Sequence, residues 1–436
     1  MTESDRRPRV AIACQGGGSH TAFTAGVLGR LFTDDVLSRY KIVGLSGTSG
    51  GAICALIAWS ALTSGNPTKA RELLGEFWAN NAAATPVEQL LNTWMLWSSQ
   101  LANFLAAPAV SPYDNPAADF ALDHLRGLLN RSIDFSAFDA VADDPQAPKL
   151  LLGAVDVMSG EFKTFNSRQR EITAEAVLAS AAIPTLFRSI HAAGGVYWDG
   201  LFSQNPPVRQ LLDTEPDEIW VIQINAQKTV VEPRTMVEIA DRRNELSGNL
   251  SLYQELHFIE KIDSLLESGQ LVGSGFHPIS IRIIEMSRSV ESQKLGEVSK
   301  INRDPAFLRQ LIEQGEAKAD IFVAALDFER AWHTGNPDEI AAFFADDCEI
   351  SAAPPFVPRE ARRGADAVRD FVTTALGNSI VVDLTRKQMS GDQVRWRVRT
   401  PSADPEHTTT GGYRVGQAVA TFDKGKITTF AMGPRP

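Results

Sequence analysis

Two glycine-rich turns constrain the fold more than any other feature of this sequence. The first contains Gly16, Gly17 and Gly18, and the second spans residues 47–51. Each follows a short apolar run and precedes a segment whose apolar residues have helical spacing. A strand, a tight turn and a helix, repeated in this order, are typical of a parallel sheet with crossover helices. The sequence therefore predicts an α/β fold with a mainly parallel sheet flanked by helices.

The remainder of the chain divides into two kinds of pattern. Apolar runs at 150–157, 219–224 and 279–284 predict further buried strands, separated by helical segments. Near residue 325 the sequence pattern changes to helices followed by strands with alternating polarity. Residues 394–399 alternate strictly between apolar and polar side chains. Such alternation is typical of an antiparallel sheet with one buried face.

We therefore expect two domains, 8–320 and 325–436, with the boundary inside or beside a helix. The second domain is expected to be a smaller, cone-shaped α+β domain with a curved antiparallel sheet.

Charge and cysteine content narrow the classes of function. The 436 residues carry a formal net charge of −11, which argues against a general nucleic-acid binder and requires any contact with an anionic membrane to be local. The three cysteines Cys14, Cys54 and Cys348 fit no disulfide or zinc pattern and predict buried thiols in a reducing compartment. The N-terminus lacks the pattern of a signal peptide, so a cytoplasmic protein is expected.

The second turn has the pattern G-x-S-x-G, with Ser49 at its centre and Gly47, Gly50 and Gly51 around it. Between a strand and a helix, this pattern presents a serine hydroxyl at the helix N-terminus, where negative charge is favoured. The hypothesis is that Ser49 is a nucleophile. A glycine-rich connecting loop without catalytic function is the alternative.

The first turn suits the stabilisation of an oxyanion. Successive N–H groups of Gly16, Gly17 and Gly18 can converge on one negatively charged oxygen. A phosphate loop and a simple tight turn are the alternatives. No lysine follows as a Walker loop requires, and Thr21 stands where a dinucleotide loop needs glycine.

The base that would activate Ser49 has two kinds of candidate. Asp199, followed by Gly200, can accept a proton directly if burial tunes it, although Asp-Gly is also a common turn. His257 and His277 would suit a Ser–Asp–His order, but Ser49 comes too early in the chain for that plan and neither histidine lies in a motif.

Together, the glycine loop, G-x-S-x-G and Asp199-Gly200 resemble the patatin-like phospholipase family. The segment ASAAIP at 179–184 is similar to the family as well. The resemblance covers about residues 8 to 320. It implies a Ser49–Asp199 dyad without histidine, acting on carboxylic acyl esters, often of lipids, with no cofactor and no metal ion.

Two positions depart from the family pattern. His20 stands where many members have arginine or lysine, and Leu201 replaces a small residue after the Asp-Gly pair. For His20 we consider stacking near the glycine loop, capping of the helix and an electrostatic role.

The aromatic-rich segment 90–110 lies between Ser49 and Asp199 in the sequence. Its polar residues make it a poor membrane span. It is either an ordinary core helix or a cap that binds acyl chains and touches a membrane surface.

Residues from about 325 onward resemble the SnoaL-like, ketosteroid-isomerase-like fold. The similarity rests on AWHTGNPD at 331–338, FFADD at 343–347 and the late strands. No residue securely matches a pocket carboxylate, and Asp346 and Asp347 fit a turn. Binding, scaffolding or homo-oligomer formation is the expected role of this domain.

The leading hypothesis is thus a serine acyl-hydrolase of lipids. A non-catalytic lipid- or acyl-binding protein on the same scaffold is the alternative. An isomerase or cyclase centred on the C-terminal domain is a third and weaker reading.

Overall fold

The computed structural model consists of two compact units. The described residues are 7–105, 111–184, 186–229, 231–273, 275–287, 289–290, 293–354, 356–357, 360–390, 393–401 and 413–434. The first unit runs to Phe258 and also contains Met286–Glu316, and the second contains Ile259–Glu285 and the chain from Ala317 onward.

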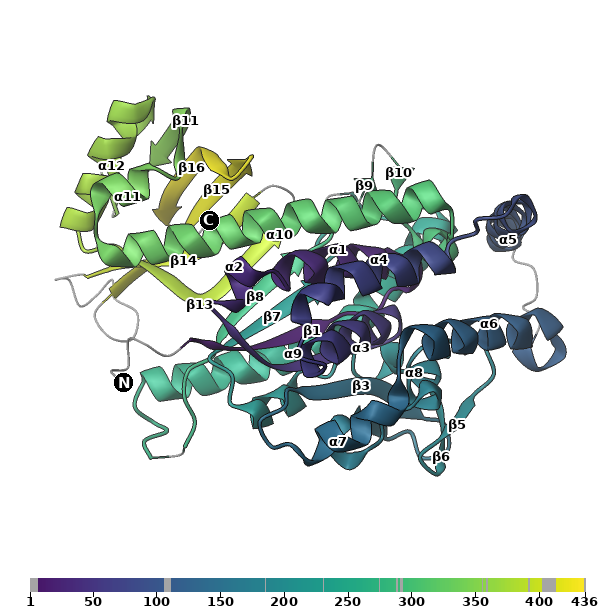
Figure 1. Cartoon of the computed structure of the whole chain (residues 1–436). Coiled ribbons are helices and arrows are strands. Elements are labelled where there is room, and N and C mark those ends of the chain that lie inside the picture. The colour runs from purple at the N-terminus through teal and green to yellow at the C-terminus, as the bar shows by residue number, and fades with distance from the viewer. Residues whose placement is uncertain are drawn as a thin grey trace. The chain divides into compact units, whose positions relative to one another are not determined.

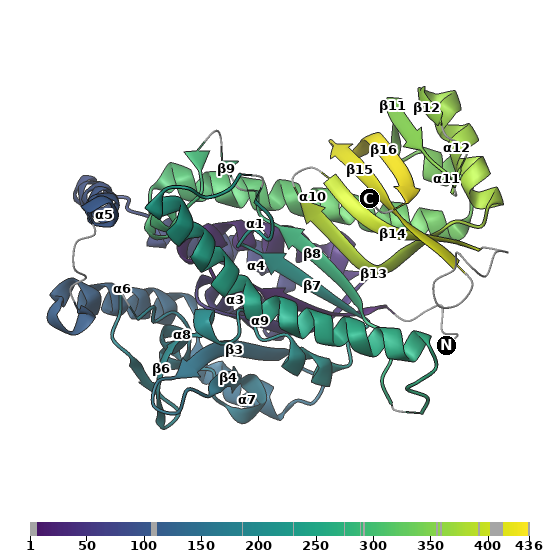
Figure 2. The same cartoon turned by 180° about the vertical axis from the view of Figure 1, so that it is seen from behind.

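The first unit is built on a mainly parallel sheet (Figures 1 and 2). Its strands follow the order β7-β1-β2-β3-β6-β5, and β4 also pairs with β3. The pairs β1–β2, β1–β7 and β2–β3 are parallel, whereas β4 and β6 run antiparallel to β3. The strands are β1 (Arg9–Cys14), β2 (Lys41–Gly47), β3 (Lys149–Asp156), β4 (Phe162–Asn166), β5 (Ile190–Ala192), β6 (Gly195–Asp199) and β7 (Glu218–Gln223).

Helices flank this sheet, as the two glycine turns predict. The helix after the second turn, α3, is buried on nearly all sides because alanine, isoleucine and leucine occupy most of its positions. A short hairpin, β9 (Ser289–Val290) with β10 (Gln293–Lys294), also belongs to this unit. The helices are α1 (Ala22–Leu31), α2 (Asp34–Leu37), α3 (Gly50–Thr63), α4 (Ala70–Asn81), α5 (Pro86–Leu105), α6 (Pro116–Ser132), α7 (Phe138–Asp143) and α8 (Ala174–Ser180).

Two long helices contain residues of both units: α9 (Met236–Glu267) and α10 (Pro305–Thr334). The boundary expected between residues 320 and 325 falls inside α10, which continues through it without interruption.

The second unit contains a largely antiparallel sheet in the order β12-β11-β16-β15-β14-β13-β8. The pairs β8–β13 and β11–β16 are its parallel ones. The expected antiparallel sheet is therefore confirmed. Its elements are β8 (Ser280–Glu285), α11 (Pro337–Ala341), β11 (Phe344–Ala352), β12 (Glu360–Arg363), α12 (Ala365–Gly377), β13 (Val381–Ser390), β14 (Gln393–Pro401), β15 (Tyr413–Asp423) and β16 (Lys426–Pro434).

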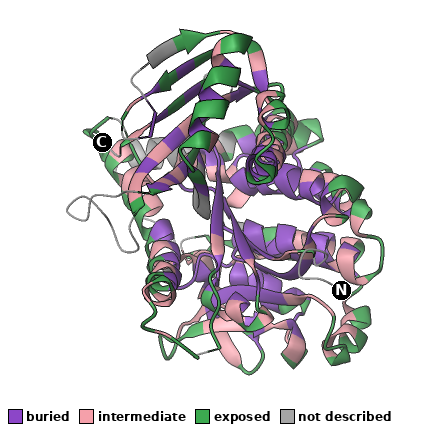
Figure 3. Cartoon of the chain, turned by 90° about the vertical axis from the view of Figure 1, so that its left-hand side faces the viewer, coloured by how far each residue is buried: buried purple, intermediate pink, exposed green. Residues whose placement is uncertain are grey.

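The core of the second unit follows from the alternation seen in the sequence. Val394, Trp396 and Val398 are buried on one face of β14, and intervening side chains are more exposed (Figure 3). Phe328 of α10 packs against Trp396 and Phe430, with ring centroids 5.5 and 6.1 Å away.

A buried ion pair ties strand β8 to this unit. Arg282 donates to Glu329 Oε2 at 2.6 Å, and Trp396 Nε1 donates to the other carboxylate oxygen at 2.6 Å. The Arg282 and Glu329 side chains are only 2% and 3% exposed. Removal of either charge would leave the other buried without its partner.

The three cysteines are buried and free, as the sequence suggests. The segment 90–110 forms all of α5 but its first four residues, up to Leu105, with residues 106–110 outside the described part. The side chains of Trp94 and of residues 97–105 also lie outside it, so the expectation that they form an acyl-binding cap stays a prediction.

Candidate active site

Ser49 lies at the sharp turn between β2 and α3. Its backbone has φ 57° and ψ −132°, a conformation that a non-glycine residue rarely adopts. It immediately precedes the first turn of α3, so the free N–H groups of that helix lie around it. The side chain is largely buried, with 7% of the residue exposed. The turn therefore has the strained geometry expected of a nucleophile elbow.

Ser180 holds this turn in place, a role that the sequence did not reveal. The Ser49 N–H donates to the Ser180 carbonyl at 3.0 Å and lies 3.1 Å from its Oγ. The Ser180 hydroxyl in turn donates to the carbonyl of Gly153 in β3 at 2.6 Å. The only sequence signal for this role was the similarity of segment 179–184 to the patatin-like family, and no function was assigned to that segment. These bonds join the nucleophile turn to a neighbouring strand.

Asp199 ends β6 and meets Ser49 inside the first unit. Its Oδ1 accepts the Leu201 N–H at 2.8 Å, and its own N–H donates to the Ala182 carbonyl at 2.9 Å. Its Oδ2 is buried and accepts no hydrogen bond of standard geometry within the described residues. The Ser49 hydroxyl is nevertheless close enough to act on the carboxyl as a hydrogen-bond donor. The structure thus brings together two residues that are 150 positions apart in sequence.

The pKa of Asp199 is raised from 3.8 to about 7. Burial is the main cause, because a carboxylate loses its hydration in the interior. The Leu201 N–H, the Ser49 hydroxyl and the charge of Lys300 oppose this shift without cancelling it. A carboxyl poised near neutral pH is suited to accept a proton.

The glycine loop packs directly against the nucleophile turn. A Cβ added at Gly16 would lie 2.6 Å from the Thr48 carbonyl and 2.9 Å from the Ser49 Cβ, so a side chain cannot fit there. The Gly16 N–H donates to Asn205 Oδ1 at 2.7 Å. Within the described residues, the N–H groups of Gly17 and Gly18 donate to no protein acceptor. Those two groups are available for a negatively charged oxygen.

The other glycines of the two motifs also lie where neighbouring segments leave no room for a side chain. A Cβ at Gly47, Gly50, Gly51 or Gly200 would come within 2.6 Å of another atom. The atoms involved belong to residues on either side of the glycine loop (Cys14, Gln15 and Thr21), to β3 or to the turn itself, so these glycines let three segments approach one another.

Gln15 is a second residue whose function the sequence did not reveal. Its Oε1 accepts the N–H groups of Ile224 and Asn225 at 2.8 and 2.7 Å. Its Nε2 donates to Asn249 Oδ1 at 2.8 Å. The completely buried amide thus joins the start of the glycine loop to the segment after β7 and to α9.

His20 is a buried, neutral residue beside the loop. Its Nε2 lies 2.8 Å from Ser299 Oγ, and its ring is 6.3 Å from that of Phe307. Burial, aided by the charge of Lys300, lowers its pKa to about 3. The lowered pKa argues against a role as a cation at neutral pH, and the contacts of His20 are those of a packing and hydrogen-bonding residue.

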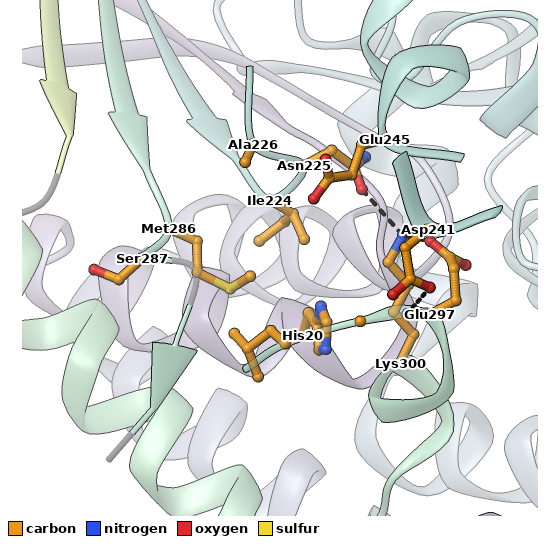
Figure 4. A pocket seen from close by; sticks show the side chains of 12 residues that line it. His20, Ile224, Asn225, Ala226, Asp241, Glu245, Met286, Ser287, Glu297 and Lys300 are labelled. Atoms are coloured by element: carbon orange, nitrogen blue, oxygen red, sulfur yellow. Dashed lines mark hydrogen bonds and ion pairs between the residues drawn. The ribbon is translucent and has the colours of Figure 1, made fainter. Parts of the chain in front are cut away.

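Lys300 supplies the positive charge in this region. Its Nζ donates to Asn225 Oδ1 at 3.0 Å and to Glu297 Oε1 at 2.5 Å (Figure 4). The same charge lowers the pKa of both Asp199 and His20. These residues and Asp241 line a cavity of about 30 Å³. This volume has room for about one water molecule.

His257 and His277 do not join this arrangement. Both side chains are exposed, whereas Ser49 and Asp199 are buried. His277 acts instead on the pKa of Asp263 in the second unit.

The first unit resembles a known family along much of its length. Residues 12–212 match the family model of the patatin-like phospholipases. The matched region is similar to a family of lipid hydrolases, and it includes Ser49, Asp199 and the glycine loop. A SnoaL-like domain matches residues 325–430. No curated protein matches the chain in sequence.

Two solved structures are similar to about a quarter of the chain. An NTF2-like protein from Mesorhizobium loti is 18% identical, with 27% of this chain and 92% of that chain covered and a TM-score of 0.23. An NTF2-like protein from Burkholderia pseudomallei is 15% identical, with 26% and 89% covered and a TM-score of 0.22.

The part of the chain that the structure describes contains no group of three or more histidine, cysteine, aspartate or glutamate side chains placed to hold a metal ion. No helix in that part combines the length and the apolar character needed to cross a bilayer.

Proposed function

We propose that the protein hydrolyses carboxylic acyl esters of lipids, with Ser49 as nucleophile and Asp199 as general base. The observation that carries the proposal is the meeting of a strained serine turn with a buried carboxyl whose pKa is about 7. A serine hydroxyl is a weak nucleophile until a neighbouring base accepts its proton. The match of residues 12–212 to patatin-like phospholipases supports the same chemistry.

In the first step, Ser49 Oγ attacks the ester carbonyl and its proton passes to Asp199 Oδ2. The Leu201 N–H holds Oδ1 at 2.8 Å, which leaves Oδ2 to receive this proton. The alcohol then leaves with the proton, and the acyl group remains on Ser49. In the second step, Asp199 removes a proton from water and the hydroxide attacks the acyl group. The bond to Ser49 Oγ then breaks, Asp199 returns the proton to that oxygen, and the carboxylic acid is released.

The tetrahedral intermediate of each step carries a negative oxygen. The glycine loop would stabilise it through the N–H groups of Gly17 and Gly18, while the bond from Gly16 to Asn205 holds the loop in place. Loss of one such donor costs about 3–4 kcal/mol in comparable sites.

Helix α5 supports contact with a lipid surface. Val87, Leu90, Leu91 and Met95 are between 40% and 70% exposed, and their spacing places them on one side of the helix. Apolar side chains of this kind insert into the boundary between lipid head groups and acyl chains. We accordingly expect a cytoplasmic protein that is peripheral to the membrane, in keeping with its free cysteines.

For the domain organisation we retain the proposal of an acyl-hydrolase domain over 8–320 and a SnoaL-like domain over 325–436. The latter would provide binding or homo-oligomer contacts, because the sequence contains no matched pocket base.

The test is turnover of p-nitrophenyl esters of several chain lengths, followed by a panel of phospholipids, lysolipids and neutral esters. Wild type should hydrolyse some of these, and Ser49→Ala and Asp199→Asn should each lose at least a hundredfold in kcat. His257→Ala is the matched control and should retain activity.

Two outcomes contradict the proposal. Equal turnover by wild type and Ser49→Ala would assign the activity to another group. Lipid binding without turnover by wild type would favour the non-catalytic binding protein.

A further inference from the structure

Three neighbouring strands of the first unit begin with a basic residue. Arg9, Lys41 and Lys149 are the first residues of β1, β2 and β3. Arg9 and Lys41 are direct partners in the parallel register. Because these strands are parallel, their amino ends meet at one edge of the sheet, and Ser49 lies beyond the opposite edge. With six or seven residues per strand at about 3.3 Å each, the two edges are roughly 20 Å apart.

The three cations line a cavity of about 600 Å³. Arg168 is a fourth basic residue in its wall, and residues 142–147 close one side. Binding sites for small molecules in proteins have volumes of roughly 300–1,000 Å³. The cavity therefore has room for a compound about the size of a nucleotide.

The two guanidinium groups bond mainly to backbone carbonyls. Arg9 donates to the Glu215 carbonyl at 2.9 Å and the Thr214 carbonyl at 2.5 Å. Arg168 donates to the carbonyls of residues 144, 145 and 147. Both groups keep further N–H donors, since a guanidinium carries five. The bonds hold the two groups rigidly while their charge is not cancelled by a side-chain carboxylate in the described part of the chain.

The two lysines differ in their partners. Lys149 pairs with the exposed Asp213 at 2.9 Å. Among the described residues, the Lys41 ammonium group makes no hydrogen bond or ion pair, although the residue is half-buried at the start of β2. An ammonium group held beside other cations raises the electrostatic energy of the site until an anion joins it.

The acidic residues of the lining offset only part of its positive charge. Asp213 pairs with Lys149 inside the lining, and Asp143 pairs at 2.7 Å with Arg170, which lies outside it. Glu215 is exposed. Four basic minus three acidic side chains leave the lining with a formal charge of +1. A positive site of this kind is notable in a chain whose net charge is −11.

We propose that this cavity binds a phosphorylated compound with at least two negative charges. Lys41 supplies the free charge, and the spare N–H groups of Arg9 and Arg168 supply directed donors to phosphate oxygens. The site lies at the opposite sheet edge from the proposed chemistry, so its ligand is distinct from the ester being cleaved. Phosphate chemistry of this kind occurs both in soluble metabolites and in lipid head groups.

The experiment is isothermal titration calorimetry of the full chain with inorganic pyrophosphate at low ionic strength. Wild type should bind, and the affinity should fall as salt is added. Lys41→Gln should bind at least tenfold more weakly. Because the Lys41 ammonium group makes no hydrogen bond or ion pair within the described residues, its substitution should leave the melting temperature nearly unchanged. Lys69→Gln, at an exposed lysine outside the cavity, is the matched control and should bind as wild type does.

A second arm distinguishes the two sources of phosphate. Co-sedimentation is measured with phosphatidylcholine vesicles that contain or lack phosphatidic acid, with pyrophosphate as competitor. Binding of pyrophosphate without any dependence on phosphatidic acid assigns a soluble ligand, and competition between the two assigns a head group. Absence of pyrophosphate binding to wild type, or equal affinity of wild type and Lys41→Gln, overturns the proposal.

Discussion

Asp199→Asn should stabilise the protein, and the gain should depend on pH. The substitution keeps the shape of the side chain and an oxygen for the Leu201 N–H, and it removes the ionisable group. The pKa of Asp199 is about 7 in the folded protein, whereas the ordinary value for aspartate is 3.8. Because the folded-state pKa is raised, this residue favours folding below pH 3.8, and that contribution is lost as the pH rises toward 7.

The size of the effect follows from the shift. A difference of about three pKa units corresponds to a cost on the order of 4 kcal/mol once the folded carboxyl is ionised. Between pH 5 and pH 8 the cost grows by roughly 2–3 kcal/mol. The free energy of unfolding of Asp199→Asn, relative to wild type, should therefore rise by that amount over this range.

The assay is urea denaturation at pH 5, 6, 7 and 8, monitored by tryptophan fluorescence, with the transition of the first unit analysed separately. Asp114→Asn, at an exposed aspartate, is the control and should show no such trend. Ester hydrolysis by wild type should also increase as the pH rises through about 7, since the base acts when ionised. A stability difference that is constant from pH 5 to pH 8 would refute the argument, because Asp199 would then titrate normally.

Three further changes test other parts of the structure. Ser180→Ala should lower kcat about tenfold with little change in KM, since it removes the hydroxyl that joins the Ser49 turn to β3. A rise in KM with kcat unchanged would contradict this. Leu90→Gln should weaken co-sedimentation with phosphatidylcholine vesicles several-fold, whereas Leu250→Gln, equally an exposed leucine, should not. Arg282→Met should cost about 3–5 kcal/mol of unfolding free energy because Glu329 loses its buried partner, and adding Glu329→Gln should recover part of that loss in thermal denaturation.

Much of the site could be read from local pattern. A serine that stands between closely spaced glycines, after a strand and before a helix, can adopt few backbone conformations. The turn at Ser49 was therefore predictable. The alternation at 394–399 likewise indicated which face of β14 is buried. These features depend on neighbouring residues, which a sequence displays directly.

Other residues could not be found in this way. Gln15 and Ser180 have no motif that states their function, because each acts by bonding to segments far away in the chain. Strand β8 was predicted from its apolar run, but its pairing with β13, about a hundred residues further along the chain, was not. The apolar run specifies a strand, whereas the partner that covers it depends on the packing of the whole unit.

The sequence by itself determined the two glycine turns and the class of fold, and it singled out Ser49 and Asp199 as the proposed pair. Only the tertiary structure decided that the aspartate is buried, that its pKa approaches 7, and that His20 is neutral. The physical reason is that turn geometry is a local property of the backbone. The hydration of a charge is decided by everything that surrounds it.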